Sequence, residues 1–183
     1  MQRQLGGDLE IEWRSYLLRP TAKPAAQARD LDAFRAYTQS WLRVAADEPR
    51  APFQVWASEA GPPSHSVPPH VAAKAAAALG DEAGRRMRER LFRAYFAESR
   101  DITDRATLRA LWSEAQLPDD AFASCDDPVH ARRVLADHQE AQALGATGVP
   151  AVRLADQDFV LVGAQPEAVY LRWLRRAIEA RVA

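Results

Sequence analysis

The stretch from residue 143 to residue 152 constrains the fold most, because it joins the end of a helical pattern to the start of a strand pattern. Gly145 is placed to end the helix, and Gly148 loosens the turn that follows. Pro150 stands directly before an apolar run. Because proline cannot donate a hydrogen bond to a sheet, it belongs at the first residue of a strand or on an edge. The Val149–Pro150 bond could be cis, since X–Pro bonds lose most of the usual preference for trans.

Two short strand patterns and a final helical pattern follow this turn. Residues 151–154 read as a strand, residues 156–158 as a polar turn, and residues 159–162 as a second strand. Residues 163–166, Gly-Ala-Gln-Pro, lead into the last helix. This succession resembles the C-terminal half of the thioredoxin fold. More narrowly, it resembles the DsbA-like family and its FrnE-like branch of disulfide oxidoreductases.

The start of the chain resembles the same family. Residues 7–20 read Gly-Asp-Leu-Glu-Ile-Glu-Trp-Arg-Ser-Tyr-Leu-Leu-Arg-Pro, and residues 9–13 alternate apolar and polar side chains. This alternation predicts a half-buried strand, which residues 14–18 extend. The phrase is similar to the second strand of the DsbA-like family. Glu10 and Glu12 would then face solvent, which explains them better than a catalytic pair of carboxylates.

The middle of the chain is predicted to be mostly helical. Apolar residues at three-and-four spacing predict an amphipathic helix over residues 31–46. Residues 61–69 contain four prolines and are expected to form a loop. Further helices are expected over residues 71–79 and 81–96, beyond an N-cap at Thr103 or Asp104, in a short turn over residues 118–122, and from Asp126-Asp127-Pro128 to Gly145.

These patterns and the resemblance together predict an α/β chain, a thioredoxin-like fold with a large inserted helical domain. Residues 1–26 would hold the second strand of the thioredoxin-like domain and residues 27–140 the insertion. Residues 141–183 would hold the Val-Pro turn, the hairpin and the last helix. The resemblance also implies a substrate-binding site at the turn, formed by Thr147, Gly148, Val149 and Pro150, with a cis Val-Pro peptide facing the redox dithiol.

The family's first strand and the C-x-x-C start of its first helix have no counterpart, because the sequence contains no C-x-x-C. In the family this strand is central, between the strands that residues 9–13 and 151–154 resemble. Its loss would leave rows of backbone groups without partners. We therefore expect a chain truncated before the second strand, and three explanations stay open. The true start lies upstream of Met1, the chain is a real fragment or pseudo-enzyme, or another subunit supplies the strand.

The resemblance implies thiol–disulfide oxidoreduction on a protein or peptide substrate, without a cofactor. That chemistry needs two neighbouring thiols, whereas Cys125 is the one cysteine, so the 183-residue chain is expected to be inactive as a dithiol oxidant. One alternative is a glutathione-dependent enzyme resembling kappa-class glutathione transferases or 2-hydroxychromene-2-carboxylate isomerases. A second alternative is a non-catalytic peptide-binding module.

Charge, hydropathy and cysteine content indicate which classes of partner and which cellular compartment to expect. The formal net charge is −1, so no global field draws the chain to nucleic acid. No apolar run is long enough to span a bilayer, and no signal peptide is visible. Sparse cysteine fits a reducing compartment, so a cytoplasmic location is expected.

The remaining chemically active side chains have simpler explanations than catalysis. The histidines lack a recognised zinc spacing, so no metal site is expected at His65, His70, His130 or His138. Carboxylates beside Cys125 are expected to raise the pKa of its thiol and slow its reactions. Most tryptophans are expected in the core. A solvated helix face explains the basic cluster Arg85, Arg86, Arg88, Arg90 and Arg93, because glutamates interleave with it.

Overall fold

The computed structural model describes residues 9–22, 30–59, 61–155 and 157–182. It divides into two compact units. We call residues 17–136 the helical unit, and the described residues of 1–16 and 137–183 the terminal unit. The domain limits expected from the sequence stay a prediction, because compactness alone does not define the domains of a fold.

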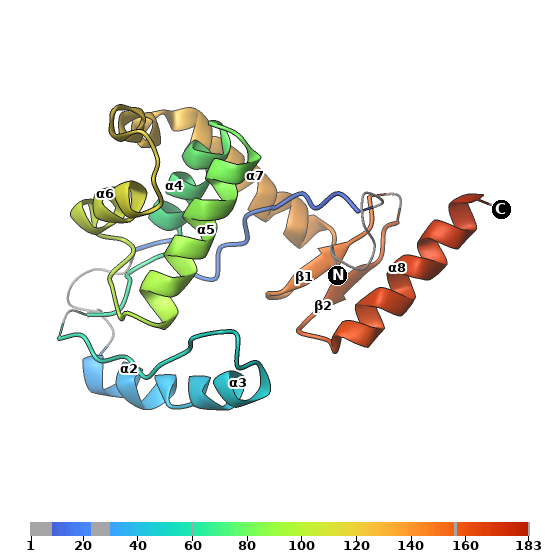
Figure 1. Ribbon diagram of the computed structural model, residues 1–183, viewed down its shortest axis with the longest axis horizontal. Helices are drawn as coiled ribbons and strands as arrows, with labels where there is room; N and C mark the ends of the chain where they lie inside the picture. Colours follow the sequence, from blue (N-terminus) through green and yellow to red (C-terminus); the bar gives the residue numbers. More distant parts are fainter. Residues whose placement is uncertain (1–8, 23–29, 60, 156, 183) are drawn as a thin grey trace. The chain divides into compact units, whose positions relative to one another are not determined.

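The helical unit consists of consecutive helices (Figure 1). They are α2 (Leu31–Thr38), α3 (Trp41–Asp47), α4 (Val67–Ala77), α5 (Asp81–Phe96), α6 (Arg105–Glu114), the 3-10 helix η3 (Asp119–Asp126) and α7 (Pro128–Ala143), which continues into the terminal unit. The predicted N-cap of α6 is confirmed at Asp104, whose carboxylate accepts the backbone N–H of Thr107 at 2.7 Å.

The single helix predicted over residues 31–46 is wrong, because α2 and α3 are separate helices. Between them the backbone N–H groups of Gln39 and Ser40 bond three residues back, to Ala36 and Tyr37. The Ser40 hydroxyl also donates to the Tyr37 carbonyl at 2.8 Å. A side chain that bonds the backbone locally competes with helix continuation, and apolar spacing does not register that competition.

The predicted loop over residues 61–69 is also partly wrong, since α4 begins at Val67 and includes Pro68 and Pro69. Proline is tolerated in the first turn of a helix, because the N–H group that it lacks would have no helical partner there. The Ser66 hydroxyl holds the chain just before α4 by accepting the backbone N–H of Arg19 at 3.1 Å.

The helical unit contains two buried clusters. The larger joins α4, α5, α6 and η3, with Met87, Leu111 and Trp112 wholly inaccessible. The Trp112 indole N–H donates to the Pro118 carbonyl at 2.8 Å, so its polar atom is satisfied. The smaller cluster is aromatic and is formed by Phe34, Trp41 and Trp56 with partly buried Leu31, Phe53, Tyr95 and Phe96.

The terminal unit contains the only strands among the described residues, β1 (Ala151–Arg153) and β2 (Val160–Val162). They pair antiparallel, with Val152 opposite Leu161. Helix α8 (Glu167–Val182) follows, and the Tyr170 hydroxyl donates to the Gly163 carbonyl at 3.2 Å. The predicted order of strand, strand and helix after the turn is confirmed.

The strand predicted over residues 9–13 is wrong, because these residues have no regular secondary structure. Their alternation is not matched by burial, since Ile11 is 40% and Trp13 is 57% exposed, while Glu10 and Glu12 are also exposed. A strand is defined by hydrogen bonds to a neighbour, and alternation supplies no neighbour. Trp13 is likewise an exception to the tryptophan core that the sequence predicts.

Candidate functional site

The predicted turn begins with a well-defined helix end. At the close of α7 the N–H of Gly145 bonds to the Gln142 carbonyl at 3.0 Å, and the N–H of Ala146 bonds to the Ala141 carbonyl at 2.9 Å. This is the bonding pattern of a Schellman motif. Its left-handed position is Gly145, with φ of +82°, which a side chain would disfavour. The predicted glycine cap is therefore confirmed.

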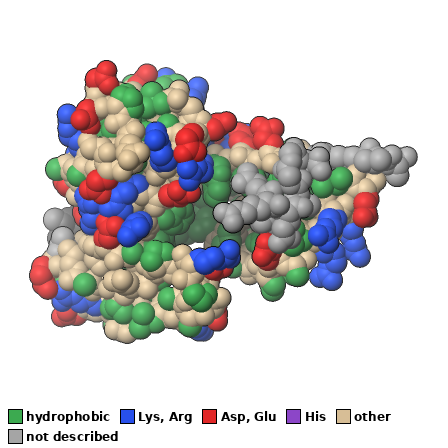
Figure 2. All heavy atoms as spheres, viewed as in Figure 1, with side chains coloured by type: hydrophobic (Ala, Val, Ile, Leu, Met, Phe, Trp, Pro, Cys, Tyr) green, Lys and Arg blue, Asp and Glu red, His purple; other side chains and the backbone are tan. Residues whose placement is uncertain are grey.

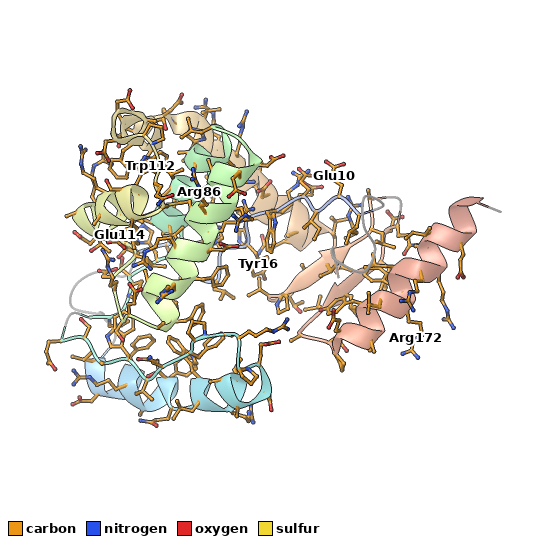
Figure 3. The ribbon with its side chains drawn as sticks, in the orientation of Figure 1. Glu10, Tyr16, Arg86, Trp112, Glu114 and Arg172 are labelled. Carbon is orange, nitrogen blue, oxygen red and sulfur yellow. The ribbon has the colours of Figure 1, made fainter. Side chains whose placement is uncertain are left out.

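Ala146 is held on its other side by a segment distant in sequence. The hydroxyl of Tyr16, which is labelled in Figure 3, donates to the Ala146 carbonyl at 3.4 Å. The Tyr16 ring meets the ring of His138 edge to face, with centroids 5.0 Å apart. Ala146 itself is 5% exposed. The chain entering the turn is thus fixed through both its N–H and its C=O.

The next residues are open. Thr147, Val149 and Pro150 are exposed, and the side chain of Val149 is 49% accessible. Within the described part of the chain, the backbone groups of Thr147, Gly148 and Val149 make no hydrogen bond. The Val149–Pro150 peptide bond is cis. The structure therefore presents three consecutive residues with unused donors and acceptors.

The hairpin fixes the far end of this open stretch. The N–H of Gly163 donates to the Pro150 carbonyl at 2.8 Å, which continues the pairing of β1 with β2. Hydrogen bonding alternates along an antiparallel strand, so the backbone groups of Ala151 and Arg153 point away from β2. No described strand pairs with that edge of β1. The open turn and the open edge are therefore continuous.

A buried carboxylate holds the segment that carries Tyr16. Asp137 of α7 is 5% exposed and accepts the backbone N–H of Ser15 at 2.8 Å. The Arg14 guanidinium donates to the same carboxylate at 3.1 Å and to Glu140 at 3.3 Å. The hydrogen bond to Asp137 is the main cause that raises the pKa of Arg14 above its usual range. Sequence reasoning missed Asp137, Arg14 and Tyr16 as supports of the turn.

The arrangement suits recognition of an extended chain. Unused backbone groups beside an exposed apolar side chain can pair with a peptide as an added strand, with the side chain supplying contact area. Thr147, Gly148, Val149 and Pro150 lie together because they are consecutive. The structure adds the supports on either side and the free edge of β1 to this predicted set.

Cys125 lies in the helical unit, at the end of η3. Burial is the main cause that raises the pKa of its thiol to about 11, with Asp126 raising it further and Arg105 opposing them. The expected direction is confirmed, but the principal cause is burial and not the neighbouring carboxylates.

We expect iodoacetamide to alkylate Cys125 about tenfold more slowly at pH 7 than it alkylates an ordinary thiol, because the scarcity of thiolate outweighs its higher intrinsic nucleophilicity. The rate should keep rising with pH and reach half its maximum at about pH 11, where half of the Cys125 thiol is ionised. Mass spectrometry of timed samples measures this rate, with the urea-unfolded chain as control. A rate that levels off near neutral pH would contradict the assigned burial.

The described residues offer neither a metal site nor a membrane span. No group of three or more His, Cys, Asp or Glu side chains in this part of the chain could hold a metal ion. His130 and His138 are buried, at 5% and 9% exposure. None of the described helices is long and apolar enough to cross a membrane.

Comparison with known proteins supports the fold. The structure is similar to that of a candidate protein disulfide isomerase from Nitrosomonas europaea, with a TM-score of 0.69 and 17% identity over 86% of this chain and 80% of the other. It is also similar to the cytosolic disulfide reductase DsbM from Pseudomonas aeruginosa, with a TM-score of 0.62 and 23% identity over 82% and 81% of the two chains.

A second structure of DsbM, with glutathione, gives a TM-score of 0.67 and 21% identity over 96% of this chain and 86% of the other. A search of curated protein sequences gives no match. The family model described as the DSBA-like thioredoxin domain matches residues 1–174. The expected thioredoxin-like fold and DsbA-like family are confirmed, and the chain belongs to the family of DSBA-like thioredoxin domains.

Proposed function

We propose that this chain acts in thiol–disulfide exchange by binding the substrate polypeptide, through the turn formed by Thr147, Gly148, Val149 and Pro150. The observation that carries the proposal is the open turn that continues into the free edge of β1. A substrate segment with a cysteine would lie extended along this edge and share its backbone hydrogen bonds. Membership of the FrnE-like branch and a cytoplasmic location are part of the proposal. The likeness to DsbM, described as cytosolic, supports that location.

Our proposal includes no dithiol catalysis by the 183-residue sequence itself. Exchange proceeds when one thiolate attacks a disulfide and a second thiol resolves the mixed disulfide. The sequence contains one cysteine, Cys125, and burial disfavours its thiolate. In an insulin-reduction assay the chain should therefore show no more turnover than its Cys125→Ser variant. Turnover that depends on Cys125 would refute this part.

Peptide binding tests the site directly. Replacing Val149 with Ser should raise the Kd for an unfolded, cysteine-containing peptide about tenfold, because burying a valine side chain stabilises a complex by roughly 1.5 kcal/mol. Fluorescence anisotropy of a labelled peptide measures this change. The matched control is Leu135→Ser, which alters a similarly exposed apolar residue, 45% accessible, on α7. Equal affinities for all three proteins would remove the turn from the binding site.

Glutathione binding is a second candidate function, favoured by the similarity to DsbM in its structure with glutathione. Glutathione is a cysteine-containing tripeptide, so the same open turn could take it as a short substrate. Calorimetry with reduced glutathione separates the two candidates. Binding of glutathione that Val149→Ser weakens, with no binding of the longer peptide, would favour the glutathione-dependent alternative.

A further inference from the structure

A hollow of about 250 Å³ lies between α5 and the C-terminal end of α6. Its charged and polar lining comprises Arg86, Glu89, Arg90 and Arg93 of α5, with Glu114 and Gln116 at the end of α6. Figure 3 labels Arg86 and Glu114, and Figure 2 shows acidic and basic side chains interspersed over the helical unit. From the sequence, the basic cluster of α5 is interpreted as a solvated helix face. Whether each of its arginines has a paired carboxylate decides whether one of them is available to a ligand.

The guanidinium of Arg90 is fully neutralised. It is 13% exposed, donates to Glu114 at 2.6 Å, and also bonds to both carboxylate oxygens of Glu98. Arg100 occupies the same Glu114 carboxylate at 2.9 and 3.0 Å. The carboxylates of Glu98 and Glu114 are therefore already paired with Arg90 and Arg100, and neither makes an ion pair with Arg86.

The remaining charges near the hollow are also engaged, with one exception. Glu89 accepts two hydrogen bonds from Arg85, at 2.7 and 2.8 Å, and Glu82 bonds to the same guanidinium. Arg93 lies 3.3 Å from Glu98, which Arg90 already occupies. Each carboxylate that lines the hollow is therefore already hydrogen-bonded to an arginine other than Arg86.

Arg86 is the exception. Its Nε atom is buried without a hydrogen-bond partner, and the described residues give its guanidinium no hydrogen bond or ion pair. Arg86 interacts with Glu82 only through the electrostatic attraction between their charges. This attraction is the smallest of the effects that lower the pKa of the Glu82 carboxyl. Arg86 therefore lines the hollow as a guanidinium without a paired carboxylate, and an anion in the hollow would supply both the missing counter-charge and hydrogen-bond acceptors.

We propose that the hollow binds one compact oxyanion, a carboxylate or a phosphate group, with Arg86 as its principal donor. A guanidinium presents a planar fork of N–H groups that matches the oxygens of either anion in two parallel hydrogen bonds. The interleaved Glu89 and Glu114 repel an extended polyanion, so the site suits a small ligand and not nucleic acid. This inference does not depend on the proposed peptide site, which lies in the other unit.

Titration with inorganic phosphate and, separately, with acetate tests the site at constant ionic strength, followed by the NMR signals of the arginine Nε–H groups. We expect saturable shifts of the Arg86 signal with at least one of the two anions, and the preferred anion identifies the ligand class. Arg86→Gln should weaken that binding at least tenfold. Glu89→Gln should strengthen it, since it removes a nearby negative charge and leaves Arg86 in place.

The matched control is Arg132→Gln, which removes an exposed arginine that has no hydrogen bond or ion pair with the described residues. It should leave the Kd within twofold of the original. The proposal is overturned if neither anion gives saturable shifts, if Arg132→Gln weakens binding as much as Arg86→Gln, or if Glu89→Gln weakens it while circular dichroism shows an intact fold.

Discussion

Replacing Gly84 with Val is expected to lower the free energy of unfolding of the helical unit by about 3 kcal/mol, the upper range for overpacking a well-filled interior. A Cβ atom at Gly84 would lie 2.9 Å from both the Cα and the Cβ of Ala77, and no real contact is that short. The Cα of Ala77 belongs to the backbone of α4, so the overlap is relieved only if α4 and α5 separate. Urea unfolding followed by circular dichroism at 222 nm measures the loss.

Two milder changes separate packing from helix propensity. Gly84→Ala gains about 1 kcal/mol from helix propensity, yet the same overlap should make it destabilising overall. Gly61→Ala adds a methyl group in a loop where nothing lies within 4 Å, so it should be neutral or slightly stabilising. If Gly84→Ala stabilises the protein by about as much as propensity predicts, the close approach of α4 and α5 is wrong.

Gly84 also shows where helix prediction from the sequence stops. The apolar spacing over residues 81–96 predicts the helix that α5 confirms. The same spacing does not explain why a glycine, Gly84, occupies the N-terminal part of this helix. The reason lies in α4, whose small residues Ala72, Ala75 and Ala76 are almost wholly buried and let the two backbones approach. Which helix a residue meets is a tertiary property, and one helix's periodicity does not contain it.

Strand prediction succeeded and failed for one physical reason. Residues 151–154 and 159–162 are close in sequence, so each supplies the other with a hydrogen-bonding partner, and β1 and β2 form. Residues 9–13 alternate more regularly, yet no partner pairs with them in the described chain. Alternation indicates which face a strand would bury, whereas the strand itself requires a neighbour.

The candidate site divides in the same way. The turn itself was predictable, because Gly145 and Pro150 act through local backbone geometry. Its supports were not, since Asp137 and Ser15 are 122 residues apart. Asp137 falls among polar residues of an amphipathic helix, where an aspartate is ordinarily solvated. Only the tertiary structure shows that its carboxylate is buried against a backbone N–H group.

Replacing Asp137 with Ala is expected to destabilise the terminal unit by about 3 kcal/mol, because breaking a buried pair from one side leaves its partners uncompensated. The N–H of Ser15 should lose the most stabilisation, because Ser15 is only 4% exposed and its N–H cannot bond to water instead. Arg14 is half-exposed, so its guanidinium can bond to water. Amide hydrogen exchange should therefore lose protection first at Ser15. The peptide affinity of the turn should fall with it, because Tyr16 holds Ala146 through the same segment.

Two matched variants separate the two contacts of Asp137 with residues 14–16. One contact is the ion pair with Arg14, and the other is the hydrogen bond from the Ser15 N–H. Asp137→Asn keeps an oxygen that can accept the Ser15 N–H, so it should retain much of the exchange protection while weakening the contact with Arg14. Glu140→Ala removes a more exposed partner of Arg14, 3.3 Å away, and should cost less than about 1 kcal/mol. If Glu140→Ala destabilises the unit as much as Asp137→Ala, Arg14 and not the buried hydrogen bond to Ser15 fixes residues 14–16. If neither changes Ser15 exchange, the segment is held by its apolar contacts, and the turn does not depend on Asp137.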